Sequence, residues 1–160
     1  MRLRKQVAVI AAALAATSSL VCGQAQPAAG PARNQPLVGV WQVLRHGVDC
    51  NTGQDLGNFF SALMTFHADG TMTADTGAAP GATSEYGVWQ RESGSQTFSF
   101  RDTGFEIDEN GHLADSGIIT ANLTLTSANT FSYTATIQFF DADGNLLFTI
   151  CGRADGTRFQ

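Results

Sequence analysis

The chain has 160 residues, 9 of them basic and 14 acidic, and its formal net charge at pH 7 is −5. An acidic surface repels phosphate groups, which argues against nucleic acids and anionic membranes as partners. With 43% hydrophobic residues, the length suits one globular domain with its own core.

The first 25 residues have the pattern of a secretory signal peptide. A basic run at 1–5 precedes an apolar run at 7–16, and Gly23-Gln24-Ala25 supplies the small residues of a cleavage site. We therefore expect cleavage after Ala25 and export to the periplasm or the extracellular space. A retained anchor is a weaker interpretation, because a spanning helix needs about 20 apolar residues. A lipoprotein attached through Cys22 is a minor alternative, because Val21 stands where a small residue is expected.

Cleavage would leave 6 basic residues, all arginine, against 14 acidic ones, a formal charge of −8. Residues 26–36 contain three of the four prolines and predict a flexible tether. The folded domain is then expected at 37–160, with no membrane contact in the mature form.

Two cysteines remain after cleavage, Cys50 and Cys151. Export places them in an oxidising compartment, so the pair predicts one disulfide across a loop of about 100 residues. Two free thiols or half of a metal site is the rival interpretation. It is disfavoured because the chain has no CxxC motif and no histidine at ligand spacing. We predict no metal and no cofactor.

The rest of the chain alternates apolar and polar residues, as strands with one buried face do. In 131–139, for example, Phe131, Tyr133, Ala135, Ile137 and Phe139 share a face. Strands are predicted at 37–46, 57–67, 70–76, 84–92, 96–107, 112–127, 130–141 and 145–153, the last extending toward 159. Short connections between eight such strands predict an all-β fold, a single antiparallel up-and-down barrel.

Asp-Gly or Asn-Gly pairs in 66–72, 107–113 and 139–147 predict hairpin turns, because these dipeptides accept a positive φ. The acidic turn at 141–145 is not a calcium loop of the EF-hand type, because it lacks the ligand spacing and the terminal glutamate.

The tetrapeptide GVWQ occurs twice, at 39–42 and 87–90. The first copy, in the first strand of the domain, resembles the G-x-W signature of lipocalins and the wider calycin group. The resemblance implies an eight-stranded barrel in which Trp41 has a structural role, with Arg153 or Arg158 stacked on it. The F-H-A-D-G-T and G-T-R segments also resemble uncharacterised bacterial exported proteins. Two four-stranded halves related by a faint internal repeat are a second interpretation of the doubled motif.

No nucleophile elbow, P-loop, dinucleotide fingerprint or HExxH motif is present. The best polar cluster is His46 with Asp49, near the expected barrel mouth. This pair could transfer protons, although a loop whose polar groups only bond its own backbone is the more common finding.

The function predicted is the binding of a small hydrophobic molecule in the barrel lumen, with Met64, Trp89 and Tyr133 pointing inward and an apolar probe quenching Trp89. The residues expected to contact the ligand are Phe60, Met64, Trp89, Tyr133 and Ile137. Two alternatives stay open: an isomerase- or cyclase-type enzyme that uses the lumen as its reaction chamber, and a filled barrel with a structural or interaction role.

Overall fold

The computed structural model describes residues 35–77, 81–92 and 96–160. The expected signal peptide and most of the expected tether therefore lie outside the described residues. No helix in the described part of the chain is long and apolar enough to cross a membrane.

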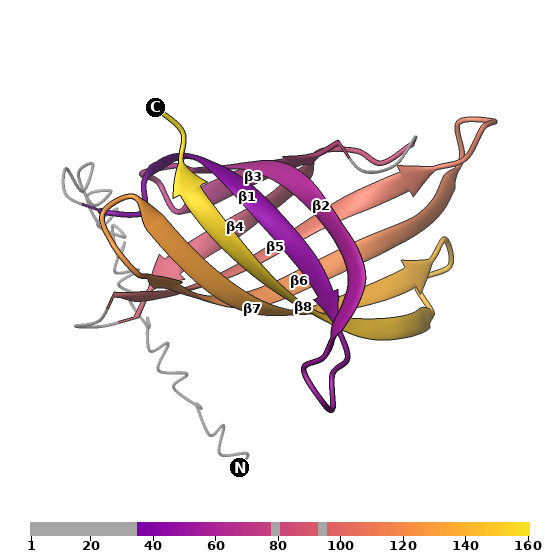
Figure 1. Cartoon of the computed structure of the whole chain (residues 1–160). Coiled ribbons are helices and arrows are strands. Elements are labelled where there is room, and N and C mark those ends of the chain that lie inside the picture. Colours follow the sequence, from indigo (N-terminus) through magenta and orange to yellow (C-terminus); the bar gives the residue numbers. More distant parts are fainter. Residues whose placement is uncertain (1–34, 78–80, 93–95) are drawn as a thin grey trace, which may run out of the picture. The chain divides into compact units, whose positions relative to one another are not determined.

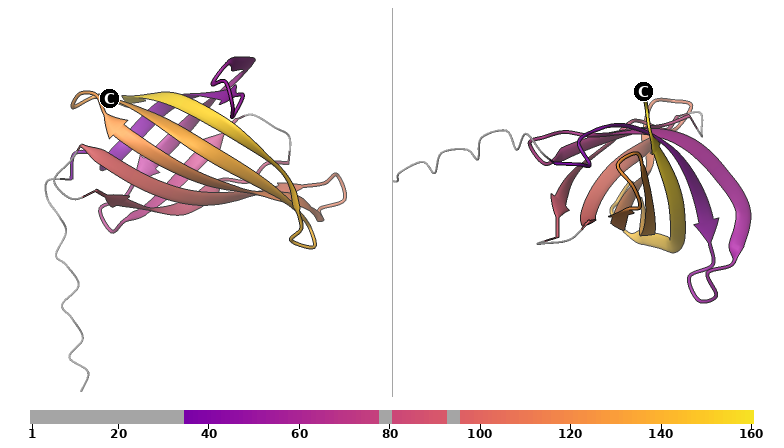
Figure 2. Two further views of the ribbon diagram at one scale, coloured as in Figure 1. Left: turned by 90° about the horizontal axis from the view of Figure 1, so that it is seen from below. Right: turned by 60° about the vertical axis from the view of Figure 1, so that its left-hand side comes forward.

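Eight antiparallel strands form a closed barrel in which each strand pairs with its neighbours in the chain and the last pairs with the first (Figure 1). Figure 2 shows the same barrel of strands in two further views. They are β1 (Gly39–Val48), β2 (Asp55–Phe66), β3 (Thr71–Thr76), β4 (Glu85–Arg91), β5 (Thr97–Ile107), β6 (Leu113–Leu125), β7 (Thr130–Asp141) and β8 (Leu146–Arg158). The predicted all-β barrel is confirmed, and β8 does extend to Arg158.

Three hairpins use the turn that their Asp-Gly and Asn-Gly pairs predict. Gly70, Gly111 and Gly144 have φ values of 88°, 83° and 85°. In the last turn the Asp141 carboxylate accepts hydrogen bonds from the amides of Asp143 and Asn145 at 3.0 and 2.8 Å. Asp141 therefore serves the turn itself.

One end of the barrel is packed solid with side chains, and we call it the filled half. Its largest fully buried side chains are Leu37, Trp41, Val43, Met64, Phe66, Met72, Phe98, Phe131 and Leu123. Trp41 and Phe131 have ring centroids 4.9 Å apart, and Phe66 meets Trp89 edge-on at 6.0 Å. Alternation along each strand delivers these side chains to the interior, as the sequence predicts.

Arg158 closes the filled half from outside. Its guanidinium lies 4.2 Å from the centre of the Trp41 ring and donates hydrogen bonds to the carbonyls of Pro36, Val38 and Ala128. A Cβ on Gly39 would lie 2.6 Å from Arg158 Nη1, and Gly39 has a φ of 136°. The glycine of the first GVWQ copy therefore makes room for the arginine that stacks on its tryptophan.

The second GVWQ copy has a different role. A Cβ on Gly87 would meet the Arg101 carbonyl at 2.3 Å, so this glycine permits close contact between β4 and β5. Trp89 donates its indole hydrogen to the His67 carbonyl at 3.0 Å. The copies lie in β1 and β4, which run in opposite directions, so they are not equivalent positions of two four-stranded halves. The repeat interpretation was wrong.

Cys50 and Cys151 form the predicted disulfide, with Cα atoms 5.1 Å apart. Val48, near the end of β1, pairs with Cys151 of β8, which brings Cys50 within reach. The bridge ties the β1–β2 loop to the last strand and is consistent with an oxidising environment.

Candidate functional site

The other end of the barrel, which we call the open half, contains a cavity of about 270 Å³. Here the turns β5–β6 and β7–β8 lie at the right in Figure 1, opposite the β6–β7 turn. The apolar residues that line the cavity include Phe60, Phe105, Ile119, Ala135, Ile137, Phe139 and Ile150.

Glycines explain why the open half is hollow. Gly47, Gly104, Gly117 and Gly152 all line the cavity and contribute no side chains to fill it. At inward positions of the filled half, three of these four strands carry Val43, Phe100 and Leu123. The strand pattern is the same along the barrel, and side-chain size decides which part is empty.

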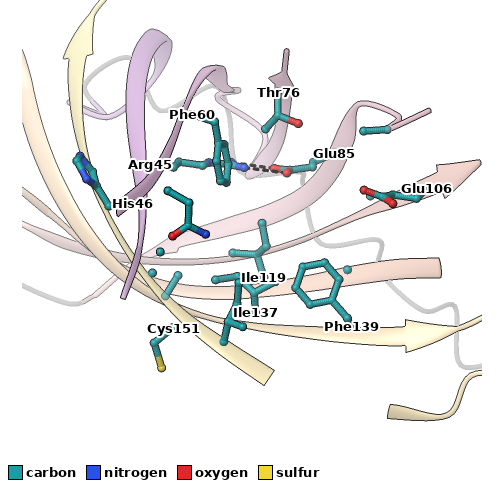
Figure 3. Close-up of a pocket in the computed structure, with 18 of the residues that line it drawn as sticks. Arg45, His46, Phe60, Thr76, Glu85, Glu106, Ile119, Ile137, Phe139 and Cys151 are labelled. Carbon is teal, nitrogen blue, oxygen red and sulfur yellow. Dashed lines mark hydrogen bonds and ion pairs between the residues drawn. The ribbon is translucent and has the colours of Figure 1, made fainter. Parts of the chain in front are cut away.

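An ion pair crosses the lumen at the floor of the cavity. Arg45 of β1 donates two hydrogen bonds to Glu85 of β4, each 2.8 Å long (Figure 3). Both side chains are buried, so loss of either partner would leave a buried charge uncompensated. The pair is bidentate, which fixes its geometry as well as its charge.

Asp102 lies next to this pair and is unusual in lacking a partner. The residue is 2% exposed, and neither carboxylate oxygen has a hydrogen-bond partner in the described part of the chain. Burial raises the pKa of Asp102 to about 7; the charge of Glu85 adds to the rise and that of Arg45 opposes it. Asp102 can therefore exchange a proton near neutral pH.

Tyr133 of β7 completes the polar floor. It lines the cavity and meets Phe100 edge-on at 5.2 Å. Burial raises the pKa of Tyr133 to about 12. Its hydroxyl therefore stays protonated at neutral pH, where it can donate a hydrogen bond to a bound molecule.

The mouth of the cavity is acidic. Glu106 of β5 and Asp115 of β6 face each other as register partners, and both line the cavity. Neither has an ion pair or a side-chain hydrogen bond among the interactions of the described residues. Like charges placed directly opposite each other on neighbouring strands are destabilising.

The five residues predicted to contact a ligand are divided between the two halves. Phe60, Tyr133 and Ile137 line the cavity. Met64 and Trp89 are buried in the filled half and do not line it. The interior orientation expected of Met64, Trp89 and Tyr133 is present, but contact with a ligand stays a prediction for all five.

His46 and Asp49 do not form the expected pair. Arg45 and Gly47 occupy the inward positions of β1, so the imidazole between them turns to the outer face. There His46 Nδ1 lies 3.0 Å from Asp55 Oδ2, and Arg153 lies 3.1 Å from the same oxygen. Figure 3 shows the His46 imidazole set apart from the Arg45–Glu85 pair.

Asp49 instead accepts hydrogen bonds from Asn51 and Thr52 within its own loop. These bonds, led by that from the Thr52 amide, lower the pKa of Asp49. The two residues therefore have separate partners, and the more common finding, a loop whose polar groups bond its own backbone, describes Asp49.

The sequence analysis did not identify the polar residues of the cavity floor. The alternation of inward and outward residues along each strand would have indicated them. Arg45 continues the inward series that begins with Trp41 and Val43. Asp102 follows Phe98 and Phe100 in the same way, at every second residue of β5. A charged residue that extends an aromatic inward series is a candidate for burial.

No protein-family model matches the chain, and no curated protein matches it. Within the described residues, no three His, Cys, Asp or Glu side chains are grouped so as to hold a metal ion.

Proposed function

We propose that this protein is an exported β-barrel that binds a small, largely apolar molecule in the cavity of the open half. The observation that carries the proposal is the contrast within one lumen. The filled half needs no ligand, whereas the open half keeps apolar walls, four glycines and a polar floor around about 270 Å³ of space. Apolar cavities with a few fixed polar groups are the usual form of small-molecule sites.

The resemblance to lipocalins supports the proposal. The Gly39-x-Trp41 motif lies at the closed end of a closed eight-stranded barrel, and Arg158 stacks on Trp41. This is the arrangement that the resemblance implies. The disulfide is compatible with export.

The positions of His46 and Asp49 do not support the alternative that the protein is an enzyme. His46 is held on the outer face by Asp55, and Asp49 bonds to its own loop. We therefore place ligand binding first.

A variant that fills the cavity tests the proposal. A Cβ on Gly117 would meet only the Phe139 ring, at 3.7 and 4.0 Å, which is ordinary contact. Gly117→Leu should therefore extend a side chain into the cavity without straining the backbone. Thr120→Leu is the matched control, because Thr120 lies exposed on the outer face of the same strand.

The measurement is a fluorescence titration with the neutral probe N-phenyl-1-naphthylamine, followed through the probe's own emission because Trp89 does not line the cavity. We expect saturable one-to-one binding to the wild type and to Thr120→Leu, and at least about tenfold weaker binding to Gly117→Leu. Circular dichroism would show that each variant is folded. Equal binding by folded Gly117→Leu and wild type would disprove the site.

A further inference from the structure

Resting on the proposed function, we propose that the ligand carries an organic ammonium group, which the acidic mouth of the cavity binds while the apolar part lies within. The proposal follows from the charges that surround the cavity and from the partners these charges have or lack.

The two mouth carboxylates are placed where a cation would stabilise them. Glu106 and Asp115 are register partners on β5 and β6, and neither is neutralised by a described side chain. Their mutual repulsion is relieved by a positive charge between them. Glu106 lines the cavity, and in Figure 3 it lies to the right of Glu85 and above the Phe139 ring.

Arg45, the arginine at the floor of the cavity, is already paired. Arg45 is bound in bidentate fashion by Glu85. Arg153 and His46 both bind Asp55 outside the lumen. An anion that took the place of Glu85 on the two Nη atoms of Arg45 would leave Glu85 buried without compensation. The one other donor of this guanidinium among the described contacts is the buried Nε–H, which has no partner.

Asp102 is a second observation that favours a positively charged ligand group. It is nine-tenths or more buried, its oxygens have no partner among the described residues, and it lies on the lumen face of β5 with Phe100 and Gly104. The Arg45–Glu85 pair carries no net charge. When Asp102 is ionised, its charge opposes a negative group brought into the lumen and favours a positive one.

The dimensions suit a compact amphipathic amine. Ile119, Ile137 and Phe139 form an apolar wall that leads inward from the mouth. A single aromatic or short aliphatic body fits against this wall, and the ammonium then reaches the Glu106–Asp115 pair. The Tyr133 hydroxyl and the Arg45–Glu85 pair close the far side.

Three probes that share one ring system test the charge preference: 1-naphthylmethylamine, 1-naphthylmethanol and 1-naphthoate. We expect the ammonium to bind about tenfold more tightly than the alcohol, because two partly exposed carboxylates each contribute modestly, and the carboxylate to bind most weakly. Isothermal titration calorimetry at low and high salt should show a smaller preference for the ammonium probe at high salt, because salt screens its attraction to the carboxylates.

The double variant Glu106→Gln/Asp115→Asn should reduce the ammonium preference to less than about twofold while the alcohol binds as before. Glu109→Gln/Asp143→Asn is the matched control, because both residues lie exposed in turns of the open end and the same charge is removed. The control should keep the full preference.

Three results overturn the inference: equal affinity for the three probes, tighter binding of the carboxylate, or the same loss of preference in both double variants. If the alcohol still binds and Gly117→Leu still blocks it, only the ammonium inference fails. If no probe binds, the proposed function fails with it.

Discussion

The filled and open halves of this barrel are built from the same eight strands, yet they differ in two respects. In the filled half, large side chains meet one another, and Trp41 and Trp89 donate their indole hydrogens to backbone carbonyls at 2.9 and 3.0 Å. In the open half, glycines face inward, and Asp102, Glu106 and Asp115 lack partners among the described residues. Tight packing and satisfied polar groups stabilise a fold, whereas unfilled space and uncompensated charge reduce stability.

From this difference we infer that the filled half stabilises the fold, whereas the open half is the candidate functional site. Natural proteins depart from good packing and polar satisfaction mainly at functional sites. The open half concentrates both departures in one place. Variants that compare the two halves should therefore give unequal results, with the largest stability losses in the filled half.

The largest expected difference compares two phenylalanines on the inward face of β7. Phe131 is 1% exposed in the filled half, and Phe139 lines the cavity. Phe131→Ala should lower the free energy of unfolding by about 4 kcal/mol, because it leaves a cavity in a packed core, whereas Phe139→Ala should cost about 1 kcal/mol. Urea unfolding measures both, and equal losses would remove the distinction between the halves.

The disulfide should stabilise the open end of the barrel. Replacing both cysteines, as Cys50→Ser/Cys151→Ser, should lower the free energy of unfolding by about 3 kcal/mol, because the unfolded chain regains the entropy of a long loop. Guanidinium unfolding measures the loss. The near-ultraviolet signal of Trp41 and Trp89 should be retained in the folded variant; its disappearance would show that the filled half depends on the bridge.

Asp102 should make the open half sensitive to pH. Its pKa is raised in the folded state, so ionisation costs stability as pH rises from the unfolded value of 3.8 to the folded value of about 7. Asp102→Asn should therefore be more stable than the wild type by about 2 kcal/mol at pH 8, with a smaller gain at pH 4.5. Asp143→Asn, at an exposed turn, is the control. A gain that does not grow with pH would refute the assignment.

The smallest effect compares two arginines of β8. Arg158→Met removes the contact with Trp41 and three hydrogen bonds to carbonyls, and should cost about 1 kcal/mol. Arg153→Met removes an exposed ion pair with Asp55 and should cost less than about 0.5 kcal/mol. Thermal unfolding of the two variants ranks them, and a larger loss for Arg153 would contradict the closing role of Arg158.

The sequence predicts the strands and turns well because their causes are local. Alternation places Phe131 and Tyr133 on one face, and Asp-Gly pairs fix the turns. The Arg158–Trp41 contact follows from the G-x-W resemblance. The candidate site is harder to predict because its cause is not local. Arg45 and Glu85 lie 40 residues apart, and only the closure of the barrel brings them together.

The same limitation explains the error at His46. Its proximity to Asp49 in sequence suggested a pair, but strand alternation turns His46 outward, where its ring lies 3.0 Å from Asp55, the register partner of Val48. The division of the predicted ligand contacts has a similar origin. Met64 and Ile137 both face inward, and only their height along the barrel decides whether they line the cavity.

The division of the lumen is tested most directly by an NMR titration of the protein with 1-naphthylmethylamine, following assigned backbone amides. We expect shifts that saturate together at Gly117, Ala135 and Gly152 of the open half, and none of comparable size at Leu123, Phe131 and Gly156 of the filled half. Shifts centred on the filled half, shifts confined to the outer face, or no shifts at saturating probe would contradict a ligand site in the open half.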